Sequence, residues 1–234
     1  MNKLHKEILE LIIQNSGMPT QHIFLDSYLG NDHPRYPINA PTLRLIAKEW
    51  MKDHRELSAS DFEKLLTSLI KGESSTEKVM AGILLDASTK PQRKFNPAVF
   101  DVWLDYLVGW AEVDSVCTGQ YTITEIPEQW KAWEKLLTKF SKSKNIQKRR
   151  ASIVLLCSPL SRHSDPRLAA LALSHVDRLK HEKEILITKA ISWVLRSMIR
   201  HHRKSVAAYL KENKDGLPKI AVRETMRKLD TGRK

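Results

Sequence analysis

The stretch KRRASIVLLCS, residues 148–158, opens with three basic residues and continues with small and apolar side chains. Four similar stretches occur along the chain: KVMAGILLDAS (78–88), VDSVCTGQYTI (113–123), TKAISWVLRSM (188–198) and KIAVRETMRKL (219–229). Equivalent positions are separated by 35, 35, 39 and 35 residues and fall at Ala81, Val116, Ala151, Ala190 and Thr225. The chain therefore contains an internal repeat built around one kind of helix.

Repeats of about 40 residues with two helices each are typical of HEAT and armadillo arrays, in which each repeat packs on its neighbours. Apolar residues recur at helical spacing in nearly every segment, and alternating strand patterns are missing. We predict an all-α fold: a right-handed, curved α-solenoid of HEAT-like helix pairs with a concave basic face. Residues 1–234 would form one domain. An irregular helical bundle with accidental spacing is the alternative.

Several helix starts can be predicted from capping residues. Asn39 with Pro41 indicates a start near residue 40, and Asn145 indicates another directly before the 148–158 stretch. In SASDFEKLL, Ser60 and Glu63 have the spacing of a capping box.

Charge is unevenly distributed along the chain, whose formal net charge is +12. Residues 141–234 contain 23 Lys and Arg against 8 Asp and Glu, which leaves 16 against 19 in residues 1–140. A positive field of this size favours polyanions such as nucleic acid. No apolar run is long enough to span a membrane, and Cys117 and Cys157 form no CxxC motif. We therefore expect a cytoplasmic protein that binds nucleic acid and not a membrane.

Trp110 and Asp114 are four residues apart in LVGWAEVDSVCTG, residues 107–119, so a helix places them on one face. Trp193 lies two repeats further along the chain. Aromatic faces and a carboxylate both attract cations, which suggests a site for a positive charge within a nucleic acid. The alternative is that both tryptophans belong to the core and that Asp114 caps a helix or pairs with an arginine.

The basic segments 141–150 and 196–204 offer phosphate contacts, which position a duplex without reading its sequence. Ordinary solvated surface is the alternative for both. Other chemistry has little support, because the chain lacks a Gly-rich phosphate loop, an HExxH motif, a Cys/His cluster and GxSxG. We predict no metal and no cofactor.

The chain resembles the AlkD-like DNA alkylation repair proteins, which are HEAT-like repeat DNA glycosylases. WAEVDS (110–115) resembles the W-x-x-V-D helix of that family, KRRASI (148–153) its Arg-Ala-x-Ile helix, and KAISWVLR (189–196) its K-A-I-x-W-x-L-R helix. LDSYLGNDHPRYPINAPTLRLIAKEW (25–50) resembles the N-terminal segment and IAVRETMRKL (220–229) the terminal repeat. The resemblance runs over most of the chain.

This resemblance implies a glycosylase that removes cationic N3- or N7-alkylated purines from double-stranded DNA without a closed base-flipping pocket. It implies a catalytic carboxylate at Asp114, flanked by Trp110 and Trp193. The expected DNA contacts are Tyr28, Lys148, Arg149, Arg150 and Arg196. In one respect the chain departs from the family, because Gly109 stands where a second aromatic residue often precedes Trp110.

Two other functions use the same features. A non-catalytic helical scaffold for distorted or branched DNA would keep the basic surface and give Asp114 no chemical role. A protein–protein adaptor would show little affinity for DNA at moderate salt. We expect the protein to be a monomer.

Overall fold

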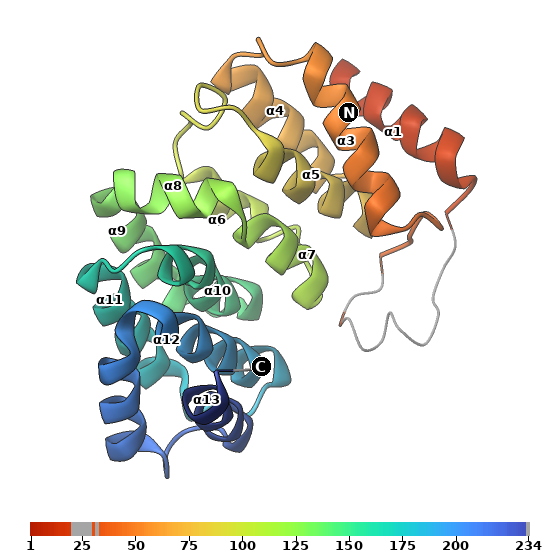
Figure 1. The fold of residues 1–234 in the computed structure, drawn as a ribbon. Coiled ribbons are helices and arrows are strands. Elements are labelled where there is room, and N and C mark those ends of the chain that lie inside the picture. Colours follow the sequence, from red (N-terminus) through yellow and green to blue (C-terminus); the bar gives the residue numbers. More distant parts are fainter. Residues whose placement is uncertain (20–29, 31–32, 233–234) are drawn as a thin grey trace. The chain divides into compact units, whose positions relative to one another are not determined.

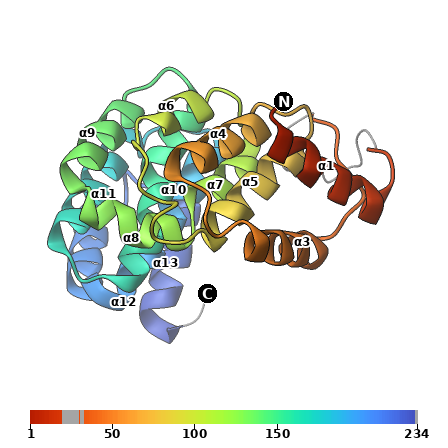
Figure 2. The same ribbon diagram turned by 90° about the horizontal axis from the view of Figure 1, so that it is seen from above.

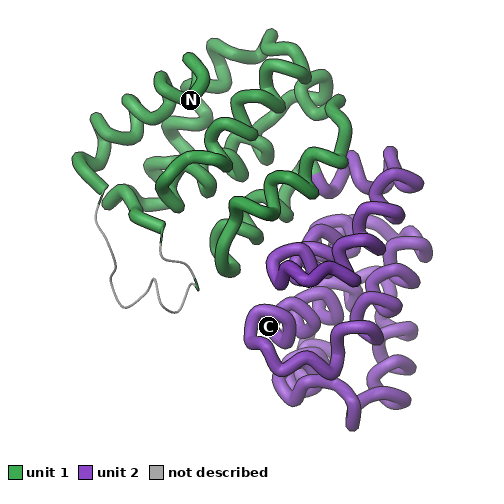
Figure 3. The backbone as a smooth tube through the Cα atoms, turned by 180° about the vertical axis from the view of Figure 1, so that it is seen from behind, with its two compact units in different colours: residues 1–121 green, residues 122–234 purple. Residues whose placement is uncertain are grey.

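The computed structural model describes residues 1–19, 30 and 33–232, and these residues form α-helices and no β-strand. The predicted all-α class is confirmed. The chain divides into two compact units, residues 1–121 and residues 122–234 (Figure 3), and each is described by itself. The single domain 1–234, the curvature and the handedness of the whole array stay predictions.

The first unit consists of two layers of helices. One layer is the row α3 (Ala40–Asp53), α5 (Ser75–Ala87) and α7 (Gly109–Cys117), in which α5 packs against both neighbours (Figure 1). In the other layer, α4 (Ala59–Ile70) packs on α5, and α1 (Lys3–Ser16) packs on α3 and α4. This is the stacking of helix pairs that the repeat predicts.

The short helix α6 (Val99–Trp103) closes the outer layer of this unit with an aromatic cluster. Phe100 and Trp103 are fully buried, and their rings lie 4.8 Å apart. Tyr121 adds a third ring 5.6 Å from that of Phe100. The indole of Trp103 donates a hydrogen bond of 2.8 Å to the hydroxyl of Thr67 on α4, which joins the two outer helices.

The second unit repeats the arrangement. Helices α10 (Ile146–Arg162), α12 (Ile185–Asn213) and α13 (Lys219–Thr231) follow one another in a row (Figure 1). Helices α9 (Trp130–Ser141) and α11 (Pro166–Leu179) pack on α10 and lie to one side of it in Figure 2. Helix α8 (Gln120–Glu128) lies at the boundary between the units. Helix α12 is kinked at His202, whose φ of −128° and ψ of 35° are not helical, so its two halves serve two successive repeats.

The five marker positions of the repeat all lie on the two rows described above, α3–α5–α7 and α10–α12–α13. They fall on α5, α7, α10, α12 and α13, and each is at most 1% exposed: Ala81, Val116, Ala151, Ala190 and Thr225. Small side chains recur there because neighbouring helices of the same row pack directly on these positions.

Two of the three predicted helix starts are confirmed. Asn39 caps α3 by accepting the backbone N–H of Thr42, and Asn145 caps α10 by accepting that of Gln147. The predicted capping box at Ser60 and Glu63 is wrong, because the N-cap residue of α4 is Ser58, two residues before Ser60. The capping box in this unit is at Ser74 and Glu77, where each side chain accepts from the backbone of the other residue.

Gly82 allows α5 and α7 to approach closely. A Cβ atom at this position would overlap the backbone carbonyl of Ser115, and a backbone atom cannot move aside as a side chain can. The distance between the two helices is therefore set by the lack of a side chain at residue 82.

We predict that Gly82→Ala lowers the free energy of unfolding by about 1–3 kcal/mol, the usual cost of overpacking, although alanine favours helix by ~1 kcal/mol. Urea unfolding followed by circular dichroism measures this change. Gly216→Ala is the control, because the nearest atoms to its Cβ would lie 3.7 Å away. Equal stability of the two variants would show that α5 and α7 do not depend on this contact.

Candidate nucleic-acid interface and carboxylate site

Trp110 and Asp114 lie one turn apart on α7, as predicted, and both side chains are half-buried. The side of the helix around Val113 and Val116 is buried in the first unit. Trp110 and Asp114 therefore share a face of α7 that this core covers only in part.

The backbone at the start of α7 explains the glycine before Trp110. Gly109 has φ of +74°, in the left-handed region that side chains rarely adopt. An aromatic residue at this position would be strained, so the departure from the family pattern belongs to the local backbone. The indole of Trp110 is then the aromatic group that the first turn of α7 presents beside Asp114.

The end of α7 is fixed by two polar contacts. Thr118 donates a hydrogen bond of 2.7 Å from its hydroxyl to the backbone carbonyl of Asp114. Asp86, at the end of α5, accepts the backbone N–H of Gln120 at 2.6 Å and so ties the chain after α7 to α5. Gly119 between them has φ of +95°, which favours glycine. These contacts hold the backbone that carries Asp114.

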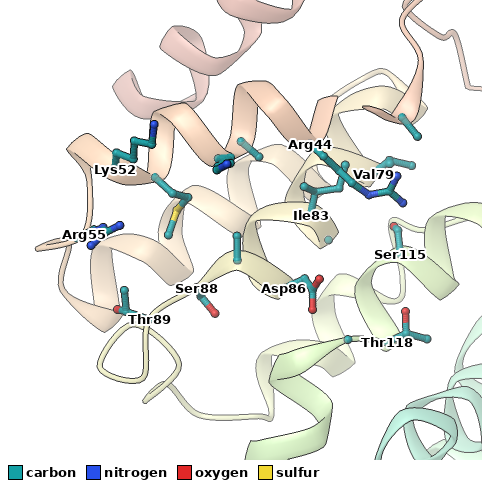
Figure 4. A pocket seen from close by; sticks show the side chains of 17 residues that line it. Arg44, Lys52, Arg55, Val79, Ile83, Asp86, Ser88, Thr89, Ser115 and Thr118 are labelled. Atoms are coloured by element: carbon teal, nitrogen blue, oxygen red, sulfur yellow. The ribbon is translucent and has the colours of Figure 1, made fainter. Parts of the chain in front are cut away.

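A groove of about 600 Å³ runs along α3, α5 and α7 within the first unit (Figure 4). Figure 4 shows Arg44 and Lys52 on one wall and Asp86, Ser115 and Thr118 on the other. Its floor is apolar and includes Met51, Val79 and Ile83. Ser115 and Thr118 are the neighbours of Asp114 on α7, so the groove borders the helix with the candidate carboxylate.

The groove wall formed by α3 and the turn that follows it carries four basic side chains. Arg44, Lys48, Lys52 and Arg55 are all exposed, and Lys52 pairs with Glu49 at 2.6 Å. Among the residues that the structure describes, no carboxylate lies within ion-pair distance of Arg44, Lys48 or Arg55. A row of cations in which only Lys52 has an ion pair among the described residues, above an apolar floor, suits a sugar–phosphate chain.

The charge balance of residues 1–140 does not predict this wall, because acidic residues outnumber basic ones there and the sum hides a local row. The signal is nevertheless present, since Arg44, Lys48 and Lys52 are spaced by four and share one helix face.

In the second unit, Trp193 and Arg196 lie on the first half of α12 and are both half-buried. Arg196 lies 3.3 Å from the carboxylate of Glu224 on α13 and donates to the backbone carbonyl of Ser192 at 3.1 Å. The structure thus gives Arg196 a role in joining α12 to α13.

Arg149 and Arg150 also make contacts inside the second unit. Arg149 binds the carboxylate of Glu182 through two hydrogen bonds of 2.8 and 3.0 Å. Arg150 is only 3% exposed and donates to the backbone carbonyl of Leu186. Lys148 is half-buried beside them on α10. Direct phosphate contacts by these residues stay predictions, and the burial of Arg150 leaves it the least accessible of the three.

The predicted site residues are distributed over both units. Trp110 and Asp114 belong to residues 1–121, and Trp193 belongs to residues 122–234, so each is described within its own unit. Tyr28 lies outside the described residues. The structure therefore places Trp110 with Asp114 and leaves the predicted approach of Trp193 to them as a prediction.

No group of three or more His, Cys, Asp or Glu side chains with metal-binding geometry occurs in residues 1–19, 30 and 33–232. Cys117 and Cys157 are buried and form no disulfide. None of the helices described here has the length and apolar character needed to cross a membrane.

Comparison with known proteins settles the family. Residues 12–229 match the DNA alkylation repair enzymes. The chain belongs to this family. A comparison with curated protein sequences gives no match. Among solved structures, the chain is similar to a predicted DNA alkylation repair enzyme from Enterococcus faecalis, with a TM-score of 0.70 and 16% identity over 88% of this chain and 93% of that one. At this identity the likeness shows the helical fold alone, and the family match supports a role in alkylation repair.

The burial of Arg150 yields a stability prediction for this family member. Arg150→Ala removes a buried donor to the Leu186 carbonyl, so we expect the free energy of unfolding to fall by about 1–3 kcal/mol. Thermal unfolding of the variant and the wild type measures this loss of stability. Arg200→Ala is the control, because Arg200 is exposed on α12. An Arg150→Ala protein as stable as the wild type would contradict this assignment and return Arg150 to the surface role.

Proposed function

We propose that this protein is a DNA glycosylase that excises cationic N3- and N7-alkylated purines by hydrolysing the N-glycosidic bond. The observation that carries the proposal is the pair Trp110 and Asp114 on the outward face of α7, beside a groove with a positive wall. Membership of the DNA alkylation repair enzymes supports an alkylated DNA substrate. Double-stranded DNA with alkylated bases is the proposed partner, and a cytoplasmic location goes with it.

The chemistry needs little more than this arrangement. An N3- or N7-alkylated purine carries a positive charge, so the C1′–N bond breaks as its electron pair moves into the purine, which leaves as a neutral base. A water oxygen then bonds to C1′, and the water gives up a proton. No strong general acid is required, because the leaving base is already cationic.

Asp114 is the group proposed to favour the transition state. Positive charge grows on the sugar as the bond breaks, and a carboxylate fixed beside that charge stabilises it. Half-burial beside the indole of Trp110 reduces the screening of this attraction by water. Trp193 is proposed as the second indole of the site, and Tyr28 as a residue near the lesion.

The basic residues are proposed to hold the duplex. In the first unit this role falls to the groove wall of Arg44, Lys48 and Arg55, for which the structure offers no ion pair among described residues. In the second unit it falls to Lys148, Arg149 and Arg196, with Arg150 supporting them from inside. The non-catalytic scaffold uses the same surfaces and differs only in giving Asp114 no chemical role.

Base release from a duplex that contains one 7-methylguanine tests the proposal. We expect wild-type protein to release free base and Asp114→Asn to do so about 10²–10³-fold more slowly, the usual loss when one stabilising group is removed. The control is Asp53→Asn, which removes an equal charge from an exposed position at the end of α3. Binding without release by the wild type would favour the scaffold, and little binding at moderate salt would favour an adaptor.

The groove wall gives a second prediction, which is independent of catalysis. With undamaged duplex, Lys48→Ala should reduce the slope of log K against log salt concentration by about 0.9, the value for one phosphate contact. Fluorescence anisotropy at several salt concentrations measures the slope. Lys64→Ala is the matched control, because Lys64 is an exposed lysine of α4 that pairs with Asp61. An unchanged slope for Lys48→Ala would remove the groove from the DNA interface.

A further inference from the structure

Glu112 is a buried carboxylate for which the proposed chemistry has no use. It lies on α7 between Trp110 and Asp114, and its side chain is 0% exposed. One of its oxygens accepts the backbone N–H of Val108 at 2.8 Å, and the other lies 2.9 Å from Nδ1 of His33. A buried charge is costly unless it is paired, so these contacts account for its presence.

A buried lysine adds to this environment. Lys78 on α5 is 2% exposed and donates a hydrogen bond of 3.0 Å to the backbone carbonyl of Ile70. Burial lowers the pKa of Lys78, while the negative charges of Glu112 and Glu77 act in the opposite direction. Glu112 therefore faces groups on α5, on α7 and on the segment that contains His33.

The segment around His33 is itself fixed to the start of α5. The carbonyl of Pro34 accepts the backbone N–H of Ser75 at 2.9 Å. The backbone N–H of Tyr36 donates to the hydroxyl of Thr76 at 3.0 Å. His33 is thus held by the first turn of α5, and its ring bonds Glu112, which connects α7 to α5 through a second route besides the contact at Gly82.

Because of the position of Glu112 within α7, these contacts determine which way Asp114 and Trp110 face. Trp110 and Asp114 are each two residues from Glu112, which is about 200° around a helix of 3.6 residues per turn. Glu112 therefore points inward, while Trp110 and Asp114 point outward. Anchoring the inward side chain at two points sets the rotation of α7 about its axis and so the direction of Asp114.

The start of α7 needs such an anchor. Its N-cap residue, Val108, provides no side-chain cap, and Gly109 adopts a left-handed backbone that glycine leaves flexible. Glu112 takes over by binding the N–H of Val108, one position later than the glutamate of a capping box. Without it, the first turn of α7 loses the contact that fixes its beginning.

We propose that Glu112 and His33 are positioning residues for Asp114 and Trp110. This inference rests on the proposed function for its link to catalysis. It assigns the pair no contact with the substrate and no proton transfer. Their role is to hold α7 at the rotation in which the carboxylate and the indole face outward together.

The first unit contains a second pair of the same kind, which provides a matched control. Nε2 of His5 lies 2.8 Å from the carboxylate of Glu77, and both residues are buried. This pair joins α1 to α5, and in the part of the chain that the structure describes it makes no hydrogen bond or ion pair with α7. A variant of either glutamate removes one buried charge from a histidine, but only Glu112 is attached to the helix of Asp114.

The test compares Glu112→Gln and Glu77→Gln on the 7-methylguanine duplex. Glutamine keeps the size of the side chain but replaces one acceptor oxygen by an NH2 donor, so at position 112 it cannot accept from both Val108 and His33. We expect Glu112→Gln to lower kcat by about 10- to 100-fold, the cost of a small misplacement, with KM and DNA affinity unchanged. Glu77→Gln should leave kcat within about twofold of the wild type, although both variants lose stability.

Two variants of His33 separate positioning from general destabilisation. In His33→Asn, an amide N–H stands near the place of Nδ1 and can donate to Glu112, whereas His33→Ala has no donor. We expect His33→Asn to keep most of the activity and His33→Ala to show the kcat loss of Glu112→Gln. Equal kcat values for His33→Ala and wild type, or equal losses in Glu112→Gln and Glu77→Gln, would overturn the proposal.

A readout without catalysis keeps this inference distinct from the proposed function. The ¹³C resonance of the Asp114 side-chain carboxyl reports its surroundings in the protein without DNA. We expect Glu112→Gln and His33→Ala to shift this resonance and Glu77→Gln to leave it in place. If wild type releases no base but the shifts occur, the proposed function fails and the positioning stands. If base is released and no shift occurs, the positioning fails alone.

Discussion

The contact between Gly82 and Ser115 is the constraint on which the first unit depends. Because residue 82 has no side chain, α7 lies directly against α5 and its apolar face is fully buried. The same contact makes α5 the floor of the groove and α7 its far wall. Helix α7 is only nine residues long, so its direction comes from these tertiary contacts and not from its own helical stability.

The polar groups around α7 complete what packing begins. Glu112 fixes the first turn, Thr118 the last, and Asp86 the chain that follows. A carboxylate stabilises a developing positive charge most strongly if it is already oriented toward it, because reorientation during the reaction would cost part of that stabilisation free energy. The contacts of Glu112, Thr118 and Asp86 hold the short helix α7 in one orientation, as the proposed role of Asp114 requires. The positive wall of Arg44, Lys48 and Lys52 on α3 borders the same groove as Ser115 and Thr118, and we propose that it attracts phosphates.

Local patterns were sufficient to predict much of the fold. The repeat spacing predicts the helices that carry the five marker positions. The caps at Asn39 and Asn145 are confirmed, because each cap depends only on neighbouring residues in the sequence. The place of Trp110 and Asp114 on one helix face also followed from spacing alone. The cap at Ser60 was wrong because Ser58 and Asp61 offer the same pattern two residues earlier, and the kink at His202 has no proline or glycine to indicate it.

The charged residues were harder to predict, because their partners are distant in sequence. Arg149 forms an ion pair with Glu182, Arg196 forms one with Glu224, and Arg150 donates to a backbone carbonyl. Part of the predicted basic surface is therefore used for contacts inside the second unit. Glu112 was not recognised, since its partner His33 is 79 residues away. The cations on α3 were hidden by acidic neighbours. Ion pairing is a property of the folded chain, whereas helical periodicity can be read from one segment.

The central claim is that Asp114 stabilises positive charge on the sugar. Binding to a duplex with a pyrrolidine abasic-site analogue, which is cationic, compared with its neutral tetrahydrofuran counterpart, measures this directly. The wild type should prefer the cationic duplex by at least about tenfold, since ~1.4 kcal/mol of attraction gives that factor. Asp114→Asn should lose the preference and bind both alike. Equal affinity of the wild type for the two duplexes, or a preference that survives Asp114→Asn, would contradict the account.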